Sequence, residues 1–124
     1  MITAVHTLVY ADDPDRARAF FRDVLGWANV DAHGGWLIFK TGPSEMGVHP
    51  TSGDDQGGWS THPHHEITLM CDDISATVAE LSAKGAEFQG GIEDQGFGLV
   101  ATMLVPGAGN MMLYQPKHPV AYSL

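Results

Sequence analysis

The chain has 124 residues, enough for one domain or for two small modules that share a core. Fifteen acidic side chains against six basic ones give a formal net charge of −9, which argues against nucleic acid as a partner and would attract a cationic ligand. No apolar run approaches the ~20 residues that cross a bilayer, no signal segment opens the chain, and the single Cys71 cannot form an internal disulfide, so we expect a cytoplasmic protein without membrane contact.

Residues 5–27 predict a strand, a capped turn and an amphipathic helix. Residues 5–10 are rich in β-branched and aromatic side chains, which suit a strand. Asp13 stands where a helix N-cap belongs, and Pro14 follows at the first helical position. Gly26 is expected to end the helix in the left-handed conformation. Apolar residues recur along one helix face at Ala17, Phe20, Phe21, Val24 and Leu25.

Three short strands are predicted after this helix, at residues 28–31, 36–40 and 45–50. They complete a first module over residues 1–50. Residues 51–64 have the Gly, Ser, Asp and Pro content of a linker, and residues 117–124 are expected to form a surface tail.

The pattern of the first unit returns at residues 65–88. The pair Asp72-Asp73 matches Asp12-Asp13, and Gly85 ends the second helix as Gly26 ends the first. Strands predicted at residues 88–94, 99–105 and 111–115 complete a second module over residues 65–116. Each module therefore has the element order βαβββ.

The repeat brings polar side chains to equivalent positions. Superposing the two Asp-Asp pairs places His6 opposite Glu66, and because strand side chains alternate, both point away from the helices. The final strands, EMGVH and NMMLY, pair His49 with Tyr114. If a pseudo-twofold axis relates the modules, then His6, His49, Glu66 and Tyr114 line one shared cleft.

These features resemble the vicinal oxygen chelate superfamily, which includes glyoxalase I, bleomycin-resistance proteins and extradiol dioxygenases. The resemblance covers nearly the whole chain and is most specific in residues 6–27, residues 65–88 and the closing VPGAGNMMLYQP. It implies an α+β fold in which two βαβββ modules form a curved mixed sheet around a cleft. It also implies a homodimer, in which the modules pair within one chain or across two.

The resemblance places metal ligands on the first and last strand of each module. His6 and Glu66 match the first-strand positions, whereas Gly47 and Met112 occupy the other two and cannot serve in the usual way. His49 lies two residues beyond Gly47 and so shares its face. We therefore expect His6, His49 and Glu66 to be the metal ligands, if a metal is bound.

Two functions remain open, and we rank the first slightly ahead. In the first, His6, His49 and Glu66 hold Fe, Zn, Ni or Mn for a lyase or dioxygenase reaction on a small oxygenated substrate, and Glu66 or Tyr114 moves a proton. In the second, a metal-free protein of the bleomycin-resistance type sequesters a small molecule or antibiotic. A third, inert alternative is a hydrogen-bonded pair of His6 and Glu66. The residues expected to line the cleft are Trp36, Trp59, Met70, Phe97, Met112 and Tyr114.

Overall fold

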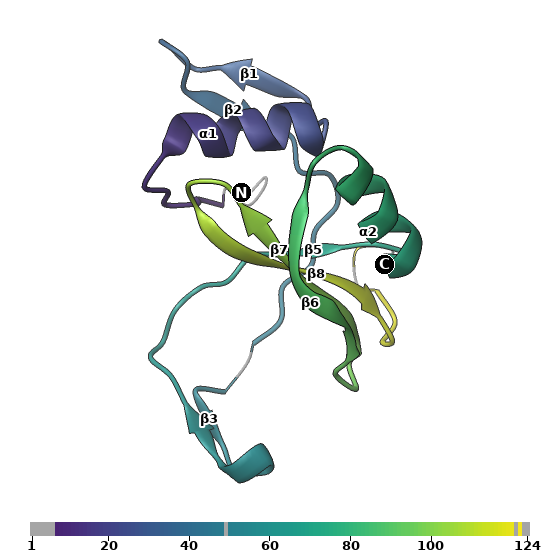
Figure 1. Ribbon diagram of the computed structural model, residues 1–124. Coiled ribbons are helices and arrows are strands. Elements are labelled where there is room, and N and C mark those ends of the chain that lie inside the picture. Colours follow the sequence, from purple (N-terminus) through teal and green to yellow (C-terminus); the bar gives the residue numbers. More distant parts are fainter. Residues whose placement is uncertain (1–6, 49, 121, 123–124) are drawn as a thin grey trace.

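The largest sheet has four strands in the order β5-β8-β7-β6 (Figure 1). The computed structural model describes residues 7–48, 50–120 and 122. Strand β5 pairs in parallel with β8, while β8 with β7 and β7 with β6 are antiparallel. The strands are β5 (Thr68–Met70), β6 (Glu87–Asp94), β7 (Gly98–Val105) and β8 (Gly109–Pro116). These bounds confirm the strands predicted in the second half of the chain.

Helix α2 (Ile74–Ala83) connects β5 to β6 and is also confirmed. The Asp73 side chain caps it by accepting from the Ala76 N–H at 3.1 Å, and Gly85 follows it with a φ of 102°. Ile74 is 1% exposed and packs against Ala101 and Leu113 on one face of the sheet.

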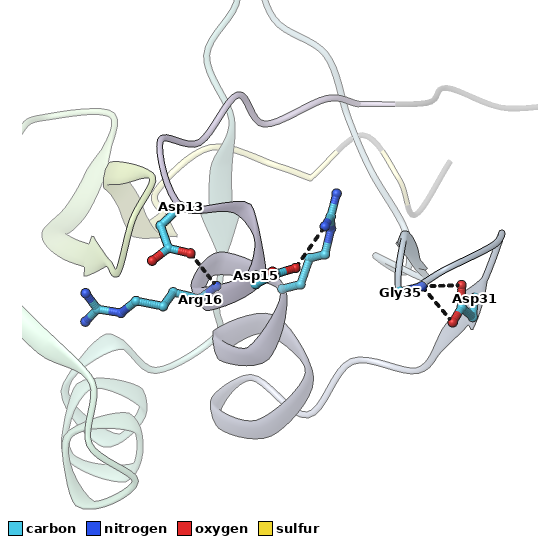
Figure 2. A network of polar contacts seen from close by, with 6 residues as sticks. Asp13, Asp15, Arg16, Asp31 and Gly35 are labelled. Atoms are coloured by element: carbon cyan, nitrogen blue, oxygen red, sulfur yellow. Dashed lines mark hydrogen bonds and ion pairs between the residues drawn. The ribbon is translucent and has the colours of Figure 1, made fainter.

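Helix α1 (Pro14–Ala19) covers the same sheet face at its other end. Its N-cap is the predicted Asp13, which accepts from the Arg16 N–H at 3.1 Å (Figure 2). The helix continues as a π-helical turn, η1 (Phe20–Val24), and the predicted Gly26 follows with a φ of 71°. Phe20 and Phe21 are buried against Met103, Val105 and Met111. Since both helices lie on this face, no helix of the described residues covers the opposite, helix-free face.

Strands β1 (Asn29–Asp31) and β2 (Leu37–Phe39) form an antiparallel hairpin beside α1 (Figure 1). The Asp31 carboxylate accepts from the Gly35 N–H at 3.1 Å and orders the turn (Figure 2). The Phe39 ring meets the Phe21 ring edge-on, with centroids 5.6 Å apart, so aromatic contacts join the hairpin to α1.

The expected strands at residues 5–10 and 45–50 are wrong where the structure describes them. Residues 7–10, 45–48 and 50 belong to no strand, while residues 5, 6 and 49 lie outside the described part. Strand propensity suits a residue to a sheet but provides no neighbouring strand, and the sheets formed by the described residues do not include these segments. Some of their apolar side chains are exposed, with Tyr10 88% and Val48 95% exposed.

The expected linker contains a small hairpin that projects from the sheet (Figure 1). Strands β3 (Ser52–Gly53) and β4 (Trp59–Ser60) pair antiparallel around the 3-10 turn η2 (Asp55–Gly57). A Cβ atom at Gly53 would lie 2.8 Å from the Trp59 indole, so only glycine fits opposite that ring. None of the helices in the described ranges is long and apolar enough to span a membrane.

Candidate functional site

Two rows of side chains cross the helix-free face of the sheet. Strand register fixes them, because directly paired residues point to the same face. The first row is Met70, Tyr114, Val100 and Glu93, and the second is Thr68, Met112, Thr102 and Gln89. This face therefore combines aliphatic, thioether and aromatic surface with hydroxyls and an acidic edge.

Tyr114 is the centre of a polar cluster on this face. Its hydroxyl donates to Glu45 Oε1 at 3.1 Å and lies 3.4 Å from His118 Nε2. His118 Nε2 is also 3.7 Å from Glu45 Oε1. The Phe97 ring meets the Tyr114 ring edge-on, with centroids 5.7 Å apart and planes at 69°. Residues far apart in the sequence thus converge on one phenol.

Burial makes these contacts stronger than surface contacts. The Tyr114 residue is 8% exposed, and the Glu45 side chain is 14% exposed. Burial raises the pKa of Tyr114, and the hydrogen bond to Glu45 and the negative charge of Glu45 raise it further. Tyr114 therefore remains a neutral phenol near neutral pH, where it can donate a hydrogen bond but is a poor base.

Sequence reasoning found Tyr114 and missed its two polar partners. Glu45 stands two residues before Gly47, so the alternation that placed Gly47 and His49 on the cleft face also applied to Glu45. His118 belongs to the segment expected to be a surface tail, and no pattern in the sequence marked it.

Three of the expected cleft residues lie on the helix-free face. Met70 and Tyr114 are direct neighbours on β5 and β8, and Met112 lies one row away on β8. Phe97 is 47% exposed and contacts Tyr114. A ligand at Tyr114 would therefore meet both thioether and aromatic surface.

The two expected cleft tryptophans have other partners. The Trp36 ring lies beneath the Arg18 guanidinium, whose Cζ is 4.8 Å from the ring centroid. Trp59 Nε1 donates to Asp55 Oδ1 at 2.7 Å within the projecting hairpin. Neither contact brings a tryptophan to Tyr114.

Glu66 is paired with a neighbouring histidine. Its Oε1 lies 2.9 Å from His64 Nε2, and its side chain is 71% exposed. The hydrogen bond from His64 Nδ1 to the His62 carbonyl, followed by the bond to Glu66, raises the pKa of His64. In the described part of the chain, the hydrogen-bond partners of the Tyr114 hydroxyl are Glu45 and His118, not Glu66.

The expected metal ligands are only partly within the structure. His6 and His49 lie outside the described residues, so Glu66 is the one ligand that can be placed. Within the described ranges, no three His, Cys, Asp or Glu side chains come close enough to hold a metal ion. Metal binding by His6, His49 and Glu66 therefore stays a prediction.

Open cavities flank the sheet in the part of the chain that the structure describes. A cavity of about 470 Å³ lies beside Met70 and is also lined by Asp72, Pro116, Val120 and Tyr122. A second cavity, of about 400 Å³, lies between α1 and the β7–β8 turn and is lined in part by Arg16, Phe20, Glu87 and Asn110. The first is adjacent to the row that contains Tyr114, because Met70 pairs with Tyr114.

Comparison with protein families finds one matching model. It describes the glyoxalase/bleomycin resistance protein/dioxygenase superfamily and matches residues 3–114. Comparison with curated protein sequences finds no significant match.

Several solved structures are similar to this chain. A lactoylglutathione lyase from Agrobacterium tumefaciens is 18% identical with a TM-score of 0.61, and the match covers 92% of this chain and 94% of that one. TnmS3, an antibiotic binding protein from Streptomyces sp. CB03234, is 21% identical with a TM-score of 0.63, covering 94% and 98%. A superfamily member from Sphaerobacter thermophilus DSM 20745 is 16% identical with a TM-score of 0.60, covering 92% and 98%. These likenesses confirm the expected α+β fold.

Proposed function

Because the chain belongs to the glyoxalase/bleomycin resistance protein/dioxygenase superfamily, we propose that it binds a small organic molecule on the helix-free face of its sheet. The observation that carries the proposal is the cluster in which the Tyr114 hydroxyl donates to Glu45 beside the half-exposed Phe97 ring. Binding sites for small molecules combine apolar walls with a few convergent polar groups, and this cluster has that composition.

The lining favours a particular kind of ligand. Phe97 offers an exposed ring on which a flat ligand can stack, and Met70 and Met112 are flexible apolar side chains that adapt to different shapes. The Glu45 carboxylate accepts hydrogen bonds and favours positive charge, and the net charge of −9 attracts cations from a distance. We therefore propose a flat, unsaturated ligand that carries a cationic or N–H-donating group.

The comparisons support sequestration as the use of this site. TnmS3 is an antibiotic binding protein with the same fold and nearly full mutual coverage. Its identity of 21% establishes the fold alone, so an antibiotic as the ligand of this chain is our proposal. Binding without turnover also suits Tyr114, since its raised pKa keeps it a hydrogen-bond donor.

The experiment compares two exposed aromatic residues. Phe97 and Trp36 are 47% and 53% exposed, but only Phe97 contacts Tyr114. The wild type, Phe97→Ala and Trp36→Ala are titrated by calorimetry with a panel of antibiotics that includes bleomycin. We expect Phe97→Ala to weaken the tightest ligand about tenfold, as the loss of one aromatic contact implies, and Trp36→Ala to bind like the wild type. Equal affinities in all three proteins would contradict the proposal.

A metal-dependent enzyme is the second candidate. Glu66 favours it, because its exposed carboxylate stands two residues before Thr68 and so shares the alternation of the helix-free face. We propose that Fe, Zn, Ni or Mn would be held by Glu66 with His6 and His49. Such a metal would polarise a substrate oxygen as a Lewis acid. Binding would require Glu66 Oε1 to leave His64 or to use its second oxygen.

Metal analysis separates the two candidates. The metal content of purified wild type is compared with that of His6→Ala and Glu66→Ala, with His33→Ala as the control. Stoichiometric metal in the wild type and the control, lost in both ligand variants, supports the enzyme. A wild type purified and dialysed against each of the four metals without retaining any contradicts it.

We also propose that the protein is a homodimer. Apolar side chains stand exposed at residues 7–10 and 46–48, which belong to no strand among the described residues, with Tyr10 88%, Met46 90% and Val48 95% exposed. Such segments pair readily with another chain, and monomers rarely expose so much apolar surface. The division into modules at residues 1–50 and 65–116 stays a prediction. In such a dimer, a module of one chain could pair with a module of the other.

Sedimentation measures the association directly. We expect a dimer for the wild type at micromolar concentration, a monomer for Val48→Lys, and a dimer for the control Val30→Lys, whose residue is 65% exposed in the β1–β2 hairpin. A monomeric wild type would contradict the dimer.

A further inference from the structure

The chain segment after β8 turns back so that its own imidazole lies on the proposed site. The His118 ring centroid is 6.1 Å from the Tyr114 ring centroid, with planes at 38°. Its Nε2 faces both the Tyr114 hydroxyl, at 3.4 Å, and Glu45 Oε1, at 3.7 Å. A flat nitrogen heterocycle thus already occupies the polar end of the site.

The ring is held at both of its nitrogen edges. His118 Nδ1 lies 2.9 Å from the Pro119 carbonyl oxygen, which can only accept, so Nδ1 carries a hydrogen. The Nε2 edge faces the oxygen of Tyr114, whose hydroxyl hydrogen is donated to Glu45, and the Glu45 carboxylate itself. This end of the site therefore places two oxygen atoms against the edge of a flat nitrogen heterocycle.

The hold on this ring is weak enough to be released. The Lys117 N–H donates to the Phe97 carbonyl at 2.9 Å, and Lys117 Nζ pairs with Asp94 Oδ2 at 2.5 Å. Both side chains of that ion pair are about half exposed, and the His118 side chain is 40% exposed. Exposed ion pairs contribute little to stability, so few strong contacts tie the segment down.

We propose that His118 is a tethered stand-in for the ligand and that the ligand carries a planar, N–H-bearing nitrogen heterocycle. On binding, the N–H groups of the ligand replace the His118 ring at Tyr114 and Glu45, and the segment at residues 117–119 moves away. This inference deepens the proposed function and rests on it. Because the tethered ring competes within the same molecule, the wild type binds more weakly than a chain whose ring is removed.

Imidazole itself is the probe. His118→Gly removes the ring, and His33→Gly removes an exposed imidazole from the turn between β1 and β2. Each protein is titrated with imidazole at about pH 6, where the probe is mostly protonated, and amide NMR shifts report binding. We expect His118→Gly to bind imidazole at least about tenfold more tightly than the wild type and His33→Gly, because its site is vacant. Adding Glu45→Gln to His118→Gly should abolish that gain.

Equal imidazole affinity in the wild type and His118→Gly overturns the inference, as does a gain that survives Glu45→Gln. If circular dichroism shows that His118→Gly is unfolded, the His118 ring resonances of the wild type are measured instead. Excess imidazole should then move the His118 ring resonances toward those of a solvent-exposed histidine, and unmoved resonances would overturn the inference.

The stand-in and the proposed function can fail independently, and the experiments tell the two failures apart. An antibiotic that binds the wild type and depends on Phe97, yet leaves the His118 resonances unmoved, keeps the proposed function and overturns the stand-in. A panel without any ligand, beside tight imidazole binding by His118→Gly, supports the stand-in and contradicts an antibiotic as the ligand.

Discussion

Tyr114→Phe removes one oxygen atom from the centre of the site and keeps the ring. The substitution retains the edge-on contact with Phe97, whose centroid is 5.7 Å from that of Tyr114. It deletes the hydrogen bond to Glu45 Oε1 and the contact with His118 Nε2. The free energy of unfolding then reports the value of the hydroxyl alone.

The magnitude follows from the type and burial of the lost bond. A hydrogen bond to a charged group contributes about 1.5–3 kcal/mol, and the 3.1 Å distance to Glu45 places this one in the lower half of that range. The Glu45 side chain is 14% exposed, so water only partly replaces the phenol. We expect Tyr114→Phe to lower the free energy of unfolding by about 1.5–2 kcal/mol.

Urea unfolding of the wild type and four variants measures this value. Tyr10→Phe is the matched control, because Tyr10 is 88% exposed and its hydroxyl should be worth less than about 0.5 kcal/mol. Tyr114→Phe, Glu45→Gln and the double variant form a double-mutant cycle, in which we expect a coupling energy of about 1 kcal/mol or more. A Tyr114→Phe loss no larger than that of Tyr10→Phe, or a coupling near zero, would refute the cluster.

The same Glu45→Gln variant tests the ionisation of the phenol. Burial raises the pKa of Tyr114 above its ordinary value of 10, and the bond and charge of Glu45 add to the rise. The stability due to the protonated phenol is therefore complete below pH 10 and lost as the pH rises through the raised value. Phenolate absorbance should show a late-titrating tyrosine in the wild type that titrates earlier in Glu45→Gln. An unchanged titration would contradict the contact.

Two further predictions concern other parts of the chain. The hydrogen bond to the His62 carbonyl and the partner Glu66 raise the pKa of His64. The stabilisation that the His64–Glu66 contact contributes is therefore fully present below the ordinary histidine value of 6.5 and is lost as the pH rises through the raised value. NMR titration should place the His64 midpoint above 6.5 and nearer to it in Glu66→Gln, and a midpoint unaffected by Glu66→Gln would count against the pair. Gly107 has a φ of 76°, and a Cβ atom there would lie 2.6 Å from the Asp13 carbonyl oxygen, whereas the control Gly109, with a φ of 86°, has open space. In urea unfolding, Gly109→Ala should lower the free energy of unfolding by about 1–2 kcal/mol through left-handed backbone strain alone. Gly107→Ala should lower it by at least about 1 kcal/mol more, because α1 must also shift. Equal losses in the two variants would contradict the docking of α1.

The second half of the chain could be predicted closely because its signals are local. Asp73 and Gly85 mark the ends of α2, and the apolar run at residues 99–105 specifies a buried strand. The first half carries the same local signals at Asp13 and Gly26, and its helix was predicted equally well. The first and last strands expected in that half could not be predicted correctly, since pairing depends on a neighbouring strand that residue propensity does not reveal.

The sequence predicts which face of the sheet carries the site, but not which residues contact Tyr114 there. Alternation along β8 identified Tyr114, because period-two geometry needs no knowledge of the rest of the fold. Glu45 and His118 reach Tyr114 from irregular segments, and such crossings leave no periodic trace in the sequence. Trp36 was expected in the cleft because of its residue type, yet it meets a local partner on α1.

A crystal structure of the protein with its tightest ligand tests the central claim most directly. We predict a ligand on the helix-free face, stacked on Phe97, with an N–H group hydrogen-bonded to Glu45 and the Tyr114 oxygen. A ligand seated instead in the cavity between α1 and the β7–β8 turn, with the Tyr114 cluster undisturbed, would contradict the account.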